Sequence, residues 1–114
     1  PAEIHGQRYI SLASFRKNGI AVRTPLWFVE DGDQLYFMTR SDSWKYRRIR
    51  NNPGVKVAPC TMRGKITGPD FSGRAAVLPR EQWPIVKRLL PKKYWLSRFG
   101  IWSKKNEFLV VELA

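Results

Sequence analysis

The segment Thr39–Pro53 carries side chains that could bind a phosphate group. On a helix that turns by about 100° per residue, Ser41, Lys45 and Arg48 fall within about 60° of one another. The N-terminus of such a helix adds free backbone N–H groups and the positive end of the helix dipole. The pattern therefore favours a phosphate site built from a cap, a helix end and two cations. The same residues fit an ordinary amphipathic helix with a solvated basic face, and this alternative stays open.

Side chains for acid–base or covalent catalysis are scarce. His5 is the only histidine, and it lies near the N-terminus, so a Ser-His-Asp triad is a poor fit. Cys60, the only cysteine, is expected at a strand end as a small buried hydrophobic residue rather than a nucleophile. One cysteine and one histidine also exclude a zinc site made by the protein alone, so we expect no metal and nominate no catalytic residue. If the protein is an enzyme, a bound cofactor must supply the chemistry.

Positive charge is concentrated in two parts of the chain. The 114 residues have a net charge of +12, and residues 40–65 and 80–105 each hold eight basic residues and one acidic residue. Such segments indicate a polyanionic partner, which could be a nucleic acid, an anionic membrane or a phosphorylated small molecule. A solvated surface without a partner is the simpler alternative.

The phosphate-binding pattern needs a scaffold, and alternation of apolar and polar residues predicts one made mainly of strands. A short helix is expected to begin after an N-cap at Ser41, Asp42 or Ser43 and to end before Pro53. A second helix is expected over Pro79–Leu90, with Pro91 ending it. Pro25 inside a strand predicts a sheet edge, a bulge or a place where a ligand replaces strand pairing. The six expected strands are Tyr9–Phe15, Ile20–Val29, Gln34–Thr39, Val55–Cys60, Phe71–Leu78 and Phe108–Leu113.

These elements favour a mainly β (α+β) single domain over residues 1–114, an antiparallel barrel or sandwich with short peripheral helices. No apolar run is long enough for a membrane span, and no signal peptide is visible, so we expect a cytoplasmic protein. Neither a Rossmann nor a P-loop glycine motif is present.

Three segments in order match the pattern of one known family. They are Lys17-Asn18-Gly19 followed by AVRTPLWF, then Ser-x-Lys-x-x-Arg-Ile-Arg-x-Asn-Pro ending at Pro53, then VKVAPC with Arg63-Gly64. On these residues the chain resembles the split β-barrel flavin-binding superfamily that includes pyridoxamine-phosphate oxidase. Within it, the chain is most similar to the deazaflavin (coenzyme F420)-dependent reductases. The resemblance covers about Tyr9 to Leu113.

The resemblance implies a homodimer of six-stranded antiparallel split β-barrels, with two cofactors in grooves between the subunits. Thr24, Pro25, Leu26 and Trp27 would then contact the tricyclic ring. Its phosphate would be bound by Ser43, Lys45 and Arg48, with Arg40 nearby, while Cys60 and Arg63 would flank the ribityl chain and phosphate. The implied cofactor is F420, whose oligoglutamate tail adds negative charges, and FMN is the alternative.

The function expected from this resemblance is hydride transfer from reduced F420 to a small organic acceptor. An FMN-binding oxidase or reductase of the same fold is one alternative. A basic barrel that stacks nucleic-acid bases is another, although most of the aromatic residues alternate into expected core positions. Trp95 and Trp102 fit either a substrate pocket or a dimer interface.

Overall fold

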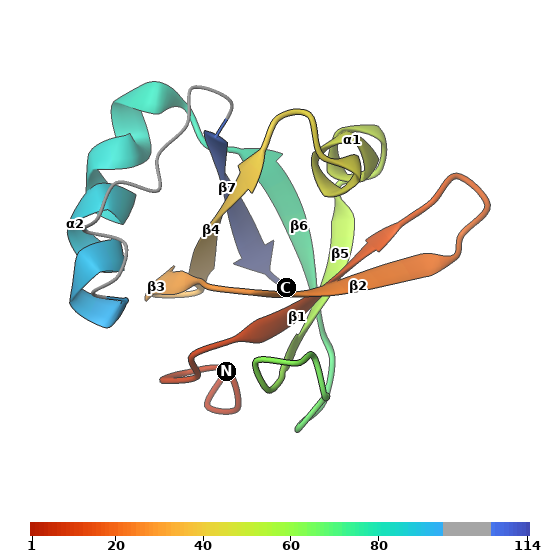
Figure 1. The fold of residues 1–114 in the computed structure, drawn as a ribbon, viewed down its shortest axis with the longest axis horizontal. Coiled ribbons are helices and arrows are strands. Elements are labelled where there is room, and N and C mark those ends of the chain that lie inside the picture. Colours follow the sequence, from red (N-terminus) through yellow and green to blue (C-terminus); the bar gives the residue numbers. More distant parts are fainter. Residues whose placement is uncertain (95–105) are drawn as a thin grey trace.

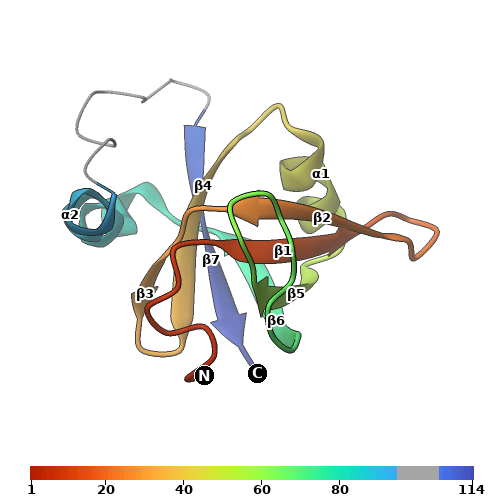
Figure 2. The same ribbon diagram turned by 60° about the horizontal axis from the view of Figure 1, so that its bottom comes forward.

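The computed structural model describes residues 1–94 and 106–114, so Trp95 and Trp102 lie outside the described residues. The described strands form one antiparallel sheet in the order β2-β1-β5-β6-β7-β4-β3. The sheet curls on itself so that its two ends approach each other, with α1 and α2 at separate places on its outside (Figures 1 and 2). The expected mainly β fold is confirmed. The strands are β1 (Ile10–Phe15), β2 (Ala21–Leu26), β3 (Val29–Asp31), β4 (Gln34–Arg40), β5 (Gly54–Pro59), β6 (Phe71–Val77) and β7 (Asn106–Leu113).

The second expected strand, Ile20–Val29, is two strands in the structure. β2 pairs with β1 and β3 pairs with β4, so these two consecutive strands are the opposite edges of the sheet. Between them, Phe28 bonds through its backbone to the Tyr94 hydroxyl instead of to a neighbouring strand. The described residues therefore contain seven strands where six were expected. Pro25 lies in β2, which is an edge strand, and a sheet edge was one of the three positions predicted for this proline.

The first helix, α1 (Trp44–Asn51), begins and ends as its sequence predicts. Ser43 is the N-cap, and its hydroxyl accepts a hydrogen bond from the Tyr46 N–H at 3.1 Å. Tyr46 and Ile49 are buried in the core inside the curled sheet, which fixes the orientation of the helix. The remaining side chains of α1 are therefore directed toward the β1–β2 turn and toward solvent.

The second helix departs from its expected bounds. A short 3₁₀ turn, η1 (Arg80–Gln82), precedes α2 (Trp83–Lys93), and Pro91 lies inside α2 instead of ending it. Proline removes one backbone donor, but the helix still closes because the Tyr94 N–H bonds to the Leu90 carbonyl at 2.9 Å. The expectation that Pro91 stops the helix was wrong. α2 covers a second core cluster that includes Val86, Leu90 and Tyr94.

In the part of the chain that the structure describes, no helix is long and apolar enough to cross a membrane.

Candidate functional site

Helix α1 is fixed to strand β1 by a polar contact as well as by its apolar face. The Arg48 Nε donates a hydrogen bond to the Ser14 Oγ at 3.0 Å, and Ser14 is buried near the end of β1. A guanidinium has five donors, so this bond orients Arg48 and leaves donors for another acceptor. The arrangement holds a positive charge at the seam between α1 and the β1–β2 hairpin.

Lys45 lies one turn before Arg48 and is half-buried. Burial, together with the positive charge of Arg48, lowers the pKa of the Lys45 ammonium. Ion pairs within 4.0 Å in residues 1–94 and 106–114 are His5–Glu30, Arg23–Asp70 and Arg40–Asp42, and none involves Lys45 or Arg48. Two adjacent cations without a carboxylate partner form a site that favours an anion.

A third group on the same face of the hairpin lacks a partner. Thr24 Oγ1 is buried and has no hydrogen-bond partner among the described residues. In the register of β1 and β2, Thr24 is opposite Leu12 and Val22 is opposite Ser14, so Thr24 and Ser14 share a face. Leaving a buried hydroxyl unpaired costs about 1–3 kcal/mol. This orphaned hydroxyl therefore lies on the hairpin face that carries Ser14, the hydrogen-bond partner of Arg48.

Two residues expected at the phosphate already have partners inside the chain. The exposed Arg40 guanidinium donates to both carboxylate oxygens of Asp42, at 3.0 and 3.1 Å, which raises the Arg40 pKa. Ser43 caps α1 and shares a 3.0 Å hydrogen bond with Thr39 Oγ1. Because Thr39 can be the donor in that bond, Ser43 can keep its own proton for a phosphate oxygen.

The four residues expected at the ring do not all face the same way. Thr24 and Leu26 are half-buried on the core side of β2, whereas Pro25 is exposed on the other side. Trp27 follows the strand and stacks on Tyr94, with ring centroids 4.7 Å apart and planes 12° apart. The single chain therefore brings Thr24, but not Pro25, to the face that holds Ser14 and Arg48.

Cys60 and Arg63 lead into a loop on the other face of the hairpin. Within this loop Gly64 lies against the Pro25 ring, and Asp70 forms a 2.6 Å ion pair with Arg23, whose register partner is Ala13 rather than Ser14. Cys60 is buried, and burial raises the pKa of its thiol, which disfavours a nucleophilic role. One chain alone does not bring Cys60 and Arg63 together with Lys45 and Arg48.

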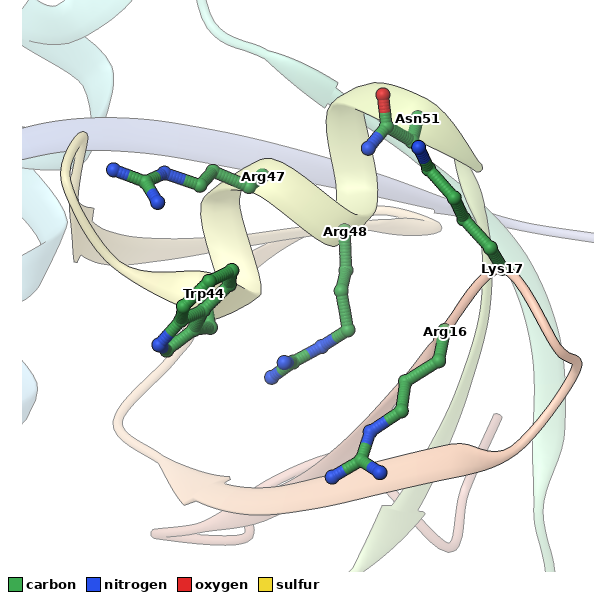
Figure 3. Close-up of a pocket in the computed structure, with 6 residues that line it drawn as sticks. All are labelled: Arg16, Lys17, Trp44, Arg47, Arg48 and Asn51. Atoms are coloured by element: carbon green, nitrogen blue, oxygen red, sulfur yellow. The ribbon is translucent and has the colours of Figure 1, made fainter.

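A pocket of about 530 Å³ lies between α1 and the β1–β2 turn, within the size range of small-molecule sites. Sequence reasoning took Arg48 as a site residue but missed the others. The missed signal is the spacing i, i+3, i+4, i+7 from Trp44 to Asn51, which places four side chains on one face of α1. The lining residues, drawn in Figure 3, are Arg16, Lys17, Trp44, Arg47, Arg48 and Asn51.

The sequence matches the family described as pyridoxamine 5'-phosphate oxidase over residues 2–114. The chain belongs to the pyridoxamine 5'-phosphate oxidase family. Family membership agrees with the resemblance drawn from the three sequence segments. No curated protein matches the sequence significantly.

Solved structures with this fold bind different cofactors. A haem-storage protein of Vibrio cholerae has a TM-score of 0.79 and 14% identity, with 96% of this chain and 83% of that chain covered. An FAD-binding protein of Mesorhizobium loti has a TM-score of 0.75 and 17% identity, covering 99% and 86%. An F420 reductase has a TM-score of 0.66 and 20% identity, covering 99% and 91%. These likenesses confirm the split-barrel fold, but the fold alone does not select a cofactor.

The side chains around Arg48 suit a phosphate better than a haem iron. The pocket is lined by cations, Trp44 and Asn51, none of which is a usual axial ligand of haem. The only histidine, His5, is exposed and lies beside Glu30 at 3.4 Å, in a different pocket that Lys93 also lines. Within the described residues, no group of three or more His, Cys, Asp or Glu could hold a metal ion.

Proposed function

We propose that the protein is a homodimeric oxidoreductase that uses coenzyme F420 to transfer a hydride to a small organic acceptor. The observation that carries this proposal is the cluster at the α1–hairpin seam. There Lys45 and Arg48 lack acidic partners, and the buried Thr24 hydroxyl on the same face lacks any partner among the described residues. Family membership and the likeness in fold to an F420 reductase support the choice of cofactor.

Lys45 and Arg48 are assigned to the cofactor phosphate. Arg48 is held in place by Ser14, so little side-chain entropy is lost when it binds an oxyanion. Ser43 supports both cations by capping the helix that carries them, and it can donate its own proton to the phosphate. Arg40, neutralised by Asp42, contributes at most a weak field at this position.

Thr24, Leu26 and Trp27 are assigned to the ring. The Thr24 hydroxyl can bond a polar edge of the tricycle, while Leu26 and Trp27 supply apolar surface that excludes water. When bound, the reduced deazaflavin supplies the hydride from its C5 atom, and the protein supplies orientation and exclusion of water. Pro25, Cys60 and Arg63 face the other side of the hairpin, so their contribution requires a groove formed in the dimer.

Cofactor titration tests the proposal. Purified protein mixed with F420 should show saturable binding at micromolar concentration by cofactor fluorescence, and Lys45→Ala should weaken it several-fold. Lys87→Ala on the exposed side of α2 is the control, because it removes the same charge away from the site. Absence of saturable F420 binding to the wild-type protein would reject the proposal.

FMN is the second candidate, since its phosphate and ring make the same demands on Lys45, Arg48 and Thr24. A protein that uses FMN should copurify yellow, with the absorbance bands of oxidised flavin. F420 is absent from common expression hosts, so a protein that uses it should copurify colourless and bind added F420 more tightly than FMN.

A further inference from the structure

A second pocket lies at the end of α2, beside β3 and the residues that precede β1 (Figure 1). Its volume of about 420 Å³ is within the range of small-molecule sites. None of its residues is assigned to the cofactor above, so a ligand bound here is additional to F420. The lining residues are His5, Gly6, Val29, Glu30, Leu89 and Lys93.

Lys93 brings a half-buried amine to this pocket. Its Nζ lies 3.6 Å from the ring centroid of Phe28, which is fully buried. Burial lowers the Lys93 pKa to about 8, with an opposing effect of Glu30 and a smaller lowering by Arg8. Near neutral pH, a far larger share of Lys93 than of an exposed lysine is therefore the neutral amine, the form that attacks a carbonyl carbon.

A carboxylate and an imidazole line the same pocket as this amine. Glu30 Oε2 accepts a hydrogen bond from the Gly6 N–H at 3.3 Å and lies 3.4 Å from His5 Nδ1. Lys93 takes part in none of the ion pairs within 4.0 Å in residues 1–94 and 106–114, so Glu30 acts on it through charge without direct contact. That separation leaves room for a small reacting group between the amine and the His5–Glu30 pair.

The walls of the pocket favour an uncharged ligand that becomes a cation. The negative face of the Phe28 ring attracts the Lys93 ammonium, and it attracts a protonated imine at the same nitrogen in the same way. Val29 and Leu89 add apolar surface on which an apolar body can pack. A small aldehyde meets both conditions, because its carbonyl is neutral before the reaction and its imine can carry a proton afterwards.

We propose that this pocket binds small apolar aldehydes as imines of Lys93. The Nζ attacks the carbonyl carbon, and one proton moves from the nitrogen through Glu30 to the oxygen, which becomes a hydroxyl. A proton that His5 takes from solvent converts this hydroxyl into water, which leaves as the C=N bond forms. One neutral amine, one aldehyde and one proton thus give one protonated imine and one water, with no oxidation or reduction.

Reductive trapping tests the proposal on the wild-type protein. Benzaldehyde with sodium cyanoborohydride converts an imine into a stable benzyl-lysine, and mass spectrometry of chymotryptic peptides measures this product at each lysine. At pH 7, Lys93 should be labelled about tenfold faster or more than Lys87. Lys87 is the internal control because it is exposed on the same helix, with its Nζ 5.6 Å from the Trp83 ring centroid. The rate at Lys93 should saturate with benzaldehyde, because binding in the pocket precedes the reaction.

The variant Glu30→Gln tests the proton transfer. Loss of the carboxylate should slow the labelling of Lys93 several-fold. The lost negative charge would by itself leave more neutral amine and speed the labelling, so the sign of the change identifies the role of Glu30. The matched control is Glu81→Gln, the same substitution at an exposed residue of η1, which should leave the labelling unchanged. Thermal unfolding checks that both variants fold.

Three results would count against the proposal. Equal labelling of Lys93 and Lys87 overturns it, and so does a rate at Lys93 that stays linear in benzaldehyde, because a binding pocket saturates. Faster labelling in Glu30→Gln overturns the proton transfer through Glu30. Each of these results leaves the proposed F420 function unaffected, because the two sites share no residue.

Discussion

At the scale of single residues, the site is marked by groups that the folded chain leaves without partners. A buried hydroxyl and a half-buried ammonium both carry a free-energy cost in the absence of a ligand. Thr24 and Lys45 are such groups, and the Arg48–Ser14 bond holds a guanidinium at the lining of the pocket beside α1. A ligand that supplies an acceptor and a negative charge recovers this cost on binding. Replacing either residue by an apolar one should therefore stabilise the ligand-free protein and weaken cofactor binding.

Thr24→Val should stabilise the ligand-free protein and weaken cofactor binding. The substitution keeps the side-chain shape and removes the unpaired Oγ1, so we expect a gain of about 1 kcal/mol in the free energy of unfolding. Cofactor affinity should fall several-fold, because the polar edge of the ring loses a partner. Urea unfolding and fluorescence titration measure the two effects, and Thr24→Ser is the control that retains the hydroxyl. A loss of stability in Thr24→Val would show that Oγ1 has a partner in the folded chain.

Lys45 gives binding a dependence on pH. Burial and the charge of Arg48 lower its pKa, so Lys45 loses its proton at a lower pH than an exposed lysine. Affinity for the phosphorylated cofactor should therefore decline as the pH rises through this lowered pKa. In Lys45→Arg the decline should disappear over the same range, since a guanidinium stays charged. Titrations at several pH values up to 10 distinguish the two curves, and parallel curves would rule out a phosphate role for Lys45.

At the scale of elements, one side chain holds three segments together. The Tyr94 hydroxyl accepts a hydrogen bond from the Phe28 N–H at 3.2 Å, and it lies 2.5 Å and 3.0 Å from the carbonyl oxygens of Arg8 and Phe28. Its ring stacks on Trp27, and the Lys93 Nζ lies 3.6 Å from the centroid of the Phe28 ring. Tyr94, at the end of α2, thereby provides hydrogen-bond partners for the Phe28 backbone between β2 and β3.

Tyr94→Phe should destabilise the protein by about 1–3 kcal/mol, because it leaves the buried Phe28 N–H without its acceptor. Tyr36→Phe is a matched control: Tyr36 is also buried, but its hydroxyl donates a hydrogen bond to the Gln34 side chain, at 2.7 Å, and not to the backbone of the described residues. The control should cost less, since Gln34 can turn to water. Chemical denaturation measures both variants, and equal losses would contradict the role given to Tyr94.

Lys93 should make stability depend on pH. Burial lowers its pKa to about 8, with a smaller lowering by Arg8 and an opposing effect of Glu30. Between pH 8 and the ordinary lysine value near 10.5, the unfolded chain holds more protons than the folded one, so stability rises with pH. Denaturation of the wild type at pH 7.5 and 9.5 should show this rise, and Lys93→Met should reduce it. If stability falls over this range in the wild type but not in Lys93→Met, the lowered pKa of Lys93 is contradicted.

The local sequence pattern was sufficient to predict most of the strands and helices, but not how they pack against one another. Alternation located the strands, and Ser43 with the apolar pair Tyr46 and Ile49 located and oriented α1. The break between β2 and β3 at Trp27–Phe28 depends on a hydrogen bond to Tyr94, which is 66 residues after Phe28. The residues around Phe28 therefore do not predict this break. The proximity of Arg16 to Arg48 depends likewise on how α1 docks on the hairpin.

The candidate site follows the same division. Lys45 and Arg48 could be selected from helical spacing alone, and in the structure Arg48 bonds to Ser14 and its charge acts on Lys45. Cys60 and Arg63 match a family motif, but their loop lies on the face of β2 that carries Pro25 and Arg23. The alternation of β2 side chains decides which face meets which loop, and sequence spacing alone does not reveal the register with β1.

At the scale of the whole molecule, the proposed homodimer needs an interface, and we expect it at a pair of exposed apolar residues. Met62 and Ile66 are 65% and 41% exposed, and both lie on the loop that covers the Pro25 face of the hairpin. Apolar side chains gathered on one exposed loop are typical of an interaction surface. In a homodimer formed there, Arg63 and Pro25 would lie near the second subunit, because the same loop packs on Pro25 through Gly64.

Met62→Glu should therefore shift the protein from dimer to monomer. Sedimentation at micromolar concentration should give a mass of roughly twice 13.3 kDa for the wild type and near 13.3 kDa for the variant. Ile20→Glu is the control, because Ile20 is also exposed, at 53%, but lies at the β1–β2 turn. A wild-type monomer, or a dimer that survives Met62→Glu, would refute this interface.

The strand order has a consequence for synthesis on the ribosome. β7 lies between β6 and β4, although it follows every other strand in sequence. Until Asn106–Leu113 leaves the ribosomal tunnel, the native pairings available to the nascent chain are limited to β2-β1-β5-β6 and β4-β3, each with an edge that β7 later fills. Open edges of this kind invite pairing with other chains. Closure of the barrel therefore awaits the last strand, and the nascent chain is most exposed to misassembly just before that strand emerges.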